Sequence, residues 1–402
     1  MNKYIDTYKL LKNSINYSES QITVPDVIEI RNFDFTSNNG YILPDGSNDD
    51  TLNGYDLKNE KGIVQEMLGI HDSDVKDNIS FRYHVFSPVG VKKTKNIVLM
   101  FHGFNEKYWN KYLPWAKYIV DTTGKTVVLF PIAFHMNRAP QEWSDIRLMF
   151  EVSNRRMELF PDIINSTLSN AAISTRMHTM PQRFVWSGLQ SYYDVIQFID
   201  NYKSGLHPFI EPDAEVDLFA YSIGAFLAEI LIMTNHKDYF EKSKLAMFCG
   251  GPVFNRLSPV SKFILDSQAN VALYSFIIEH LDSHLKMNNK LRHYLCETPE
   301  GVSFRTMLNY GVMSDLREER LRAISDRVFA VSLKNDTVVP PYEVANTLQG
   351  KYRDIPIKVE IHDLPYPYKH EDPFPVTEKL SDDIDAGFRR VFEPIGKFLS
   401  DQ

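Results

Sequence analysis

A serine near the middle of the chain has the surroundings of a nucleophile. Ser222 lies in the segment LFAYSIG, residues 218–224, where an apolar run ends and a helical pattern begins. A sharp strand-to-helix turn requires small residues two positions before and two positions after the serine. Ala220 and Gly224 meet this requirement, although alanine replaces the usual first glycine. The segment predicts an exposed, nucleophilic Ser222 hydroxyl beside the first amides of the helix; the alternative is a tight packing turn.

A second segment has the features needed to stabilise the negative charge that forms when a serine attacks a carbonyl group. The apolar run 97–101 ends in His102-Gly103-Phe104-Asn105. Preorganised backbone amides aimed at such an oxyanion lower the barrier to acyl transfer. The amides of Phe104 and Ile223 are therefore predicted to form an oxyanion hole. The side chain of His102 is interpreted as structural, and Asn105 either contacts the site or caps the next helix.

These segments belong to a series of short apolar runs separated by helical patterns. Runs this apolar are typical of strands buried on both faces, and their alternation with helices predicts a parallel sheet with right-handed crossovers. The predicted strands are 96–101, 126–130, 216–220, 245–249, 328–333 and 357–361, and the predicted helices are roughly 106–121, 184–204, 224–237, 341–350 and 383–400.

The first part of the chain has a different pattern. Residues 27–33 and 80–86 alternate apolar and polar side chains, which predicts half-exposed antiparallel strands that lead into the sheet. Residues 40–62 are rich in Gly, Asn and Asp and are predicted to form a long surface loop. Two excursions, 135–183 and 255–322, contain helical patterns and leave from the strand ends where open α/β sheets bind ligands. They are expected to cover a pocket.

The combination of His-Gly after one strand and Ala-Tyr-Ser-Ile-Gly after a later strand resembles the α/β-hydrolase superfamily. The resemblance covers roughly residues 80–402 apart from the two excursions. It implies an α/β-hydrolase fold, with a mostly parallel central sheet flanked by helices and a helical lid insertion. The domains expected on this basis are an N-terminal extension with a leading antiparallel strand (1–79), the core (80–254 and 323–402, with the excursion 135–183) and a helical lid (255–322).

The resemblance also implies the order serine, acid, histidine, each on a loop after a strand. After the run 328–333 comes KNDTVVP, residues 334–340, which is similar to the acid turn of the superfamily and makes Asp336 the expected acid. The alternative is that Asp336 caps the next helix. The turn Gly250-Gly251-Pro252, another place for the acid in some members, contains no carboxylate.

The histidine has two candidates. His362 ends the predicted strand 357–361, whereas His370 follows on the loop PYPYKHEDP, residues 365–373. Because a catalytic histidine must reach the serine from a loop, His370 is favoured over His362. The expected catalytic triad is Ser222, Asp336 and His370, with Phe104 and Ile223 as oxyanion hole.

The resemblance implies a serine hydrolase that cleaves a carboxylic ester of a small or medium substrate through an acyl-enzyme intermediate, without a cofactor. Amide, peptide and thioester cleavage use the same constellation, so the bond type is open. An acyltransferase, which excludes water from the acyl-enzyme, and a non-catalytic protein that keeps the scaffold for ligand binding are the alternatives.

Composition narrows the partners and the compartment. The net charge of −8 argues against a nucleic-acid binder, and no apolar run reaches the length of a membrane span. Two cysteines and a start without a signal-peptide pattern predict a cytoplasmic protein. His280 and His284 have a spacing that a metal accepts, but they are interpreted as structural, and residues 122–126 lack the first glycine of a phosphate-binding loop. The oligomeric state is not indicated.

Overall fold

The computed structural model describes residues 3–44 and 71–400. Nine strands of these residues form one sheet, in the order β1-β2-β3-β5-β4-β6-β7-β8-β9. The strands are β1 (Gln21–Val24), β2 (Ile28–Thr36), β3 (Ser80–Ser87), β4 (Thr94–Phe101), β5 (Thr126–Leu129), β6 (Ile210–Tyr221), β7 (Leu245–Phe248), β8 (Val328–Leu333) and β9 (Lys358–His362). The pairs β1–β2, β2–β3 and β3–β5 are antiparallel, and the five other pairs are parallel.

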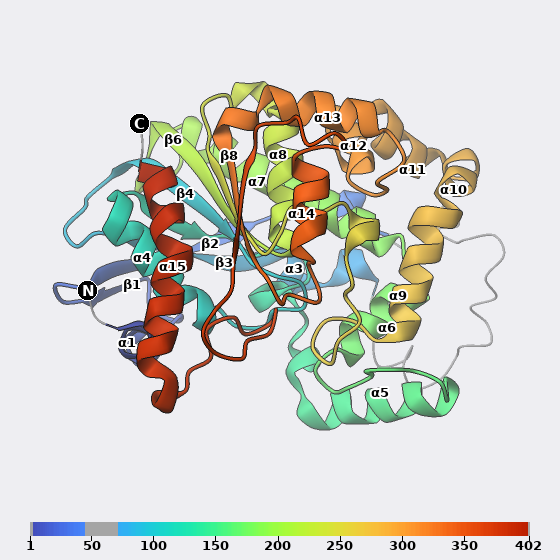
Figure 1. Cartoon of the computed structure of the whole chain (residues 1–402), viewed down its shortest axis with the longest axis horizontal. Coiled ribbons are helices and arrows are strands. Elements are labelled where there is room, and N and C mark those ends of the chain that lie inside the picture. The colour runs from blue at the N-terminus through green and yellow to red at the C-terminus, as the bar shows by residue number, and fades with distance from the viewer. Residues whose placement is uncertain (1–2, 45–70, 401–402) are drawn as a thin grey trace.

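Helices cover both faces of the sheet (Figure 1). They are α1 (Tyr4–Ser14), α3 (Lys76–Ile79), α4 (Leu113–Thr123), α5 (Ile146–Leu159), α6 (Ala171–Thr179), α7 (Arg183–Lys203), α8 (Ile223–Thr234), α9 (Ser267–Tyr274), α10 (Leu281–Met287), α11 (Asn289–Arg292), α12 (Pro299–Thr306), α13 (Ser314–Ala323), α14 (Pro341–Leu348) and α15 (Ser381–Ser400). Helices α1, α4 and α15 pack together on one face, and α7 and α8 lie on the other. The mostly parallel sheet between two helical layers is the predicted α/β-hydrolase fold.

The central strands show why their sequences are apolar without interruption. In β4, Ile97, Leu99 and Phe101 contribute to the core beneath α7 and α8, whereas Val98 and Met100 contribute to the core beneath α4 and α15. Side chains of a strand alternate between the faces of its sheet, so a strand covered on both sides must be apolar at every position. This geometry confirms the parallel, doubly covered sheet that the runs predict.

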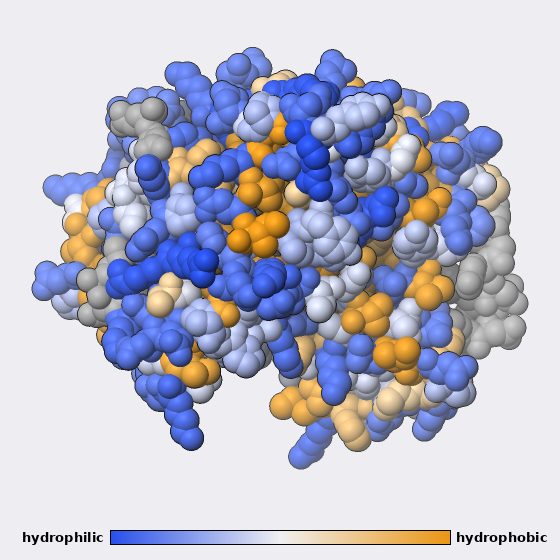
Figure 2. All heavy atoms as spheres, in the orientation of Figure 1, coloured by the Kyte–Doolittle hydropathy of each residue, from blue (hydrophilic) through white to orange (hydrophobic). Residues whose placement is uncertain are grey.

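The two excursions pack against each other. Helix α6 of the first packs against α9 of the second. Between them the buried guanidinium of Arg156 donates to both oxygens of Asp266, at 2.7 and 2.9 Å. Ile146 and Phe150 of α5 and Val271 of α9 are exposed, and Figure 2 shows apolar side chains among the polar ones over this part of the surface.

Several details differ from the sequence prediction. Helix α1 and strand β1 are additional; α1 buries Tyr4, Ile5 and Leu11 against α4 and α15. Within the excursion 255–322, a π-helical turn at Ser275–Glu279 separates α9 from α10. Most of the predicted loop 40–62 lies outside the described residues, and residues 40–42 form a 3₁₀ turn. Within the described chain, no helix combines the length and hydropathy needed to span a membrane.

Candidate active site

Ser222 occupies a strained turn between β6 and α8. Its φ and ψ are 56° and −123°, a conformation that L-residues rarely adopt, and its half-buried side chain projects from the first turn of the helix. The turn is surrounded by backbone at close range. A Cβ atom on Gly224 would lie 2.8 Å from the carbonyl oxygen of His102, and one on Gly250 would lie 2.4 Å from the Cβ of Ala225. Glycine is therefore required at both positions.

The methyl group of Ala220, by contrast, is fully buried within the core on the α8 side of the sheet. This placement explains why alanine suffices two residues before Ser222. The small-residue requirement read from the sequence thus has a direct steric cause. Gly250, just after the neighbouring strand β7, is a further position near Ser222 where a larger residue would clash.

Of the three residues expected to form a triad, His370 lies between the other two, within hydrogen-bonding distance of both. His370 Nε2 is 2.8 Å from Ser222 Oγ, and His370 Nδ1 is 2.8 Å from Asp336 Oδ2. Asp336 and His370 are each only 5% exposed. Because Nδ1 donates to the carboxylate, the lone pair of Nε2 is directed at the serine hydroxyl. The arrangement places an acceptor next to the Ser222 proton.

The carboxylate of Asp336 is held from its other side. Its Oδ1 accepts hydrogen bonds from the backbone amides of Val338 and Val339, at 2.9 and 2.8 Å. Asp336 therefore stabilises the turn that follows β8 and also faces His370; it does not cap the next helix, α14, which begins at Pro341 without a side-chain cap. Both functions of the one carboxylate depend on its two oxygens pointing in different directions.

The other histidine candidate lies elsewhere. His362 is the last residue of β9, where its Nε2 is 3.1 Å from Glu360 Oε2. Burial lowers the pKa of His362, and the charge of Glu360 partly opposes that shift. The strand holds His362 within the sheet, while the loop after it carries His370 to Ser222.

The residues whose backbone amides were predicted to form an oxyanion hole, Phe104 and Ile223, line the same small cavity as Ser222. Phe104 and Ile223 donate no backbone hydrogen bond to any other group in the described part of the chain, and Ile223 is the first residue of α8. The amide of Gly103 is not available, because it donates to the hydroxyl of Tyr112 at 2.9 Å. Among the described residues, the Phe104 and Ile223 amides thus remain free to donate to a ligand, whereas the Gly103 amide does not.

His102 fixes the peptide that carries the Phe104 amide. Its Nδ1 donates to the carbonyl oxygen of Gly103 at 2.8 Å, and its Nε2 accepts from the amide of Ile132 at 2.9 Å. Burial lowers the pKa of His102 well below its ordinary value, so the ring is neutral. In a trans peptide the C=O and the N–H point in opposite directions. By holding the Gly103 carbonyl, His102 therefore orients the Phe104 N–H, which agrees with a structural role.

A cluster of Tyr221, Lys111 and Glu106 beside the His370 loop was not predicted from the sequence. The phenol of Tyr221 donates to the backbone carbonyl of His370, and the two rings stack with centroids 5.3 Å apart and planes at 17°. The ammonium of Lys111 lies 4.7 Å from the Tyr221 ring centroid and donates to the carbonyl of Glu371 at 2.9 Å. Lys111 also pairs with Glu106. The position of Tyr221 before the serine was the one available signal, whereas nothing in the sequence indicated Lys111.

The group of His, Cys and carboxyl side chains with metal-like spacing in the described residues is Cys249, Asp336 and His370. Both imidazole nitrogens and both carboxylate oxygens already have the partners given above. Burial and the charge of Asp336 raise the pKa of the Cys249 thiol well above its ordinary value, so it stays protonated. A metal ligand must be deprotonated and free, so this cluster does not fit a metal ion.

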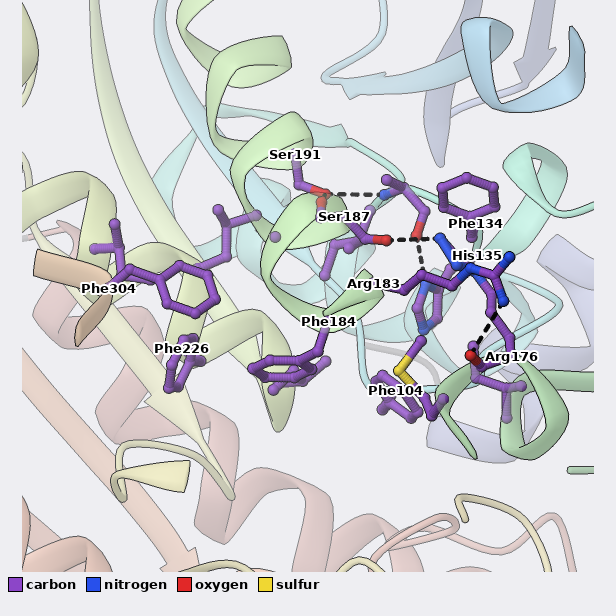
Figure 3. A pocket seen from close by; sticks show the side chains of 18 residues that line it. Phe104, Phe134, His135, Arg176, Arg183, Phe184, Ser187, Ser191, Phe226 and Phe304 are labelled. Carbon is purple, nitrogen blue, oxygen red and sulfur yellow. Dashed lines mark hydrogen bonds between the residues drawn. The ribbon is translucent and has the colours of Figure 1, made fainter. Parts of the chain in front are cut away.

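One small apolar cavity adjoins Ser222, and a second small apolar cavity lies next to it. The first, of about 40 Å³, contains Ser222, Ile223 and Phe104 in its wall. The other, of about 50 Å³, shares Phe104, Phe184 and Ile223 with the first. In Figure 3 this second cavity has Phe226 and Phe304 at one end and Phe104, His135 and Arg176 at the other.

A larger groove, of about 690 Å³, lies on the side of His370. It is lined mainly by residues of the segment 257–263, by Asn270 and Tyr274 of α9, and by residues 368–371. The serine thus stands between small apolar cavities and a wide, more polar groove.

The strand order and the serine turn define an α/β-hydrolase fold. The chain belongs to the family of unknown function designated DUF6051, whose sequence model matches residues 1–400. A comparison with curated proteins gave no match.

Among solved structures, the chain is similar to a carboxyl esterase from the mycorrhizal fungus Tuber melanosporum, with 12% identity over 79% of this chain and 80% of that chain and a TM-score of 0.43. It is also similar to a thermostable esterase from Pseudomonas putida (10% identity, 100% and 92% coverage, TM-score 0.43) and to the esterase Est22 (12% identity, 98% and 85% coverage, TM-score 0.45).

Proposed function

We propose that this protein is a serine hydrolase that cleaves carboxylic esters through an acyl-enzyme intermediate. The observation that carries the proposal is the hydrogen-bonded chain from Ser222 through His370 to Asp336, with both distances at 2.8 Å. A buried imidazole with an acceptor nitrogen toward a serine hydroxyl and a donor nitrogen toward a carboxylate is the arrangement that activates serine as a nucleophile.

In the first step His370 Nε2 takes the Ser222 proton while Oγ bonds to the ester carbonyl carbon. The amides of Phe104 and Ile223 donate to the resulting oxyanion, and Asp336 stabilises the imidazolium. The ester C–O bond then breaks as His370 returns the proton to the departing alcohol. Water, deprotonated by the same imidazole, attacks the acyl-enzyme and releases the acid and the free serine.

Labelling with a fluorophosphonate probe tests this proposal directly. The wild-type protein should be labelled at Ser222 and should hydrolyse p-nitrophenyl acetate. Ser222→Ala should lose labelling and at least about 10³-fold in kcat, because losing a triad member removes the nucleophilic route. A wild-type protein without labelling or turnover would support the non-catalytic ligand-binding alternative instead.

A matched pair of variants tests the histidine assignment. His370→Ala should abolish labelling. His362 is a half-buried histidine paired with Glu360, and His362→Ala should be labelled at the wild-type rate. Loss of labelling in His362→Ala with retention in His370→Ala would refute the assignment. Product analysis with added alcohols separates hydrolysis from acyl transfer, since a transferase would form a new ester.

A further inference from the structure

The cavities near Ser222 are neighbours that share wall residues but differ greatly in size. The apolar cavity at Ser222 shares Phe104, Phe184 and Ile223 with the 50 Å³ cavity, and it shares Phe254, Leu257, Pro259 and Val338 with the 690 Å³ groove. A substrate lying across these cavities would pass Ser222 with one part at each end.

The reaction geometry decides which part lies where. The carbonyl oxygen must point at the amides of Phe104 and Ile223, and the leaving oxygen must face His370, which protonates it. Phe104 and Ile223 line the small apolar cavities, and His370 lines the large groove. The acyl group therefore belongs in the small cavity and the alcohol in the groove.

The acyl end is small and apolar. Its wall is formed mainly by apolar side chains such as Phe184, Phe226 and Phe304, whose rings lie 5.2 to 6.0 Å apart. Since a water-sized group needs about 10–15 Å³ of such space, the cavity of about 40 Å³ that has Ser222 in its wall holds roughly three of them. This size suits acyl groups of two to about four carbons.

The alcohol end is wide and offers free hydrogen-bonding groups beside aromatic rings. The side chains of Ser258, Asn270 and Thr337 line the groove and make no hydrogen bond with other residues of the described chain. Phe263 and Tyr274, which also line it, are exposed. Amide and hydroxyl groups next to exposed rings suit a ligand that carries several hydroxyl groups on an otherwise apolar ring.

We propose that the substrate is an ester of a short acyl group, of two to about four carbons, with a polyhydroxylated alcohol of the size of a sugar. The inference rests on the proposed function, since it requires Ser222 to attack the ester and His370 to release the alcohol. A long-chain lipid ester would not fit the acyl cavity, and an apolar alcohol would leave the groove's polar groups without partners.

The acyl side is tested with p-nitrophenyl acetate, butanoate and octanoate. Octanoate should be at least about tenfold poorer in kcat/KM than the better of the two short esters, because its chain exceeds the cavity. Phe226→Leu, which shortens a side chain of the cavity wall, should raise the octanoate-to-acetate ratio several-fold. The control Phe388→Leu makes the same change in the opposite core, near α1 and α4, and should leave the ratio unchanged. Wild-type activity that rises from acetate to octanoate would overturn the proposal.

The alcohol side is tested with methyl 6-O-acetyl-glucopyranoside and cyclohexylmethyl acetate, which present the same CH₂–O–acetyl group on a hydroxylated and an apolar ring. The sugar ester should be preferred by at least about tenfold in kcat/KM, the effect of one or two well-placed hydrogen bonds. Asn270→Leu should reduce this preference several-fold. The control Val271→Leu, on the same helix but outside the groove, should preserve it.

The outcomes separate this inference from the proposed function. Hydrolysis of both acetates that depends on Ser222, with equal rates or a preference for the cyclohexyl ester, overturns the substrate class and leaves the serine hydrolase intact. Absence of fluorophosphonate labelling and of turnover with every ester overturns both. Circular dichroism and labelling of each variant show whether a lost preference reflects a lost fold.

Discussion

Replacement of Asp336 by asparagine tests the hydrogen-bond chain most sharply, because it turns one acceptor into a donor without changing the size of the side chain. In the wild-type protein one carboxylate oxygen accepts from the amides of Val338 and Val339, and the other faces His370 Nδ1. In Asp336→Asn those two amides retain the side-chain oxygen, since the opposite orientation would set an NH₂ group against two N–H donors. The NH₂ group then faces Nδ1.

An imidazole that accepts at Nδ1 carries its proton on Nε2 and cannot take the proton of Ser222. We expect kcat for p-nitrophenyl acetate to fall by about 10³- to 10⁴-fold, which corresponds to roughly 4–5.5 kcal/mol in the barrier. The free energy of unfolding, measured by urea titration, should change by no more than about 1–2 kcal/mol, because both amide hydrogen bonds remain.

Asp363→Asn is the matched control for this variant. Asp363 is a partly exposed aspartate that accepts from Asn335 and Lys334, and its replacement should leave kcat unchanged. The reasoning is refuted if Asp336→Asn, measured at neutral pH, retains more than a tenth of the wild-type kcat.

Three further predictions concern the elements that support the site. Gly224→Ala should destabilise the protein by about 1–3 kcal/mol in urea unfolding and slow fluorophosphonate labelling, because its Cβ would lie 2.8 Å from the His102 carbonyl; unchanged stability and labelling would contradict the steric argument. Tyr221→Phe keeps the ring but loses the hydrogen bond to the His370 carbonyl, so kcat should fall about tenfold with KM unchanged; an effect on KM alone would count against this positioning role. Burial holds the pKa of Glu229 well above its ordinary 4.5. As the pH rises, the folded state therefore keeps a proton that the unfolded chain releases, and the free energy of unfolding falls. The expected decline is about 1.4 kcal/mol per pH unit between about pH 5 and the folded-state pKa. In Glu229→Gln this decline in the free energy of unfolding should disappear from urea titrations. Equal pH slopes for both proteins would argue against a buried, protonated Glu229.

The positions that sequence reasoning located best are those governed by local rules. The strands β4 to β8 were recognised from apolar runs, because a doubly covered strand must be apolar on both faces; β9, at the edge of the sheet, is more exposed. The turn at Ser222 was recognised from the small residues Ala220 and Gly224, and at Gly224 the nearby His102 carbonyl excludes even a methyl group. The choice of His370 over His362 used only the fact that a strand restrains a side chain more than a loop does. The cytoplasmic location and the domain boundaries remain predictions.

Other features depend on segments that are distant in the sequence, and only the folded chain determines them. Helix α1 buries its apolar residues against α4, about a hundred residues further along the chain, and against α15 near the C-terminus. Its short apolar pattern therefore carried little signal of its own. Lys111 reaches the His370 loop through the ring of Tyr221 and the carbonyl of Glu371.

The sequence by itself determined the type of fold, because apolar periodicity and turn sterics act over a few neighbouring residues, and the resemblance to the α/β-hydrolase superfamily implied the order of the proposed catalytic side chains. The tertiary structure decided the distances between Ser222, His370 and Asp336, the neutral state of His102 and the unequal cavities on the two sides of the serine. These properties come from burial and from hydrogen bonds between separate segments, which no local pattern encodes.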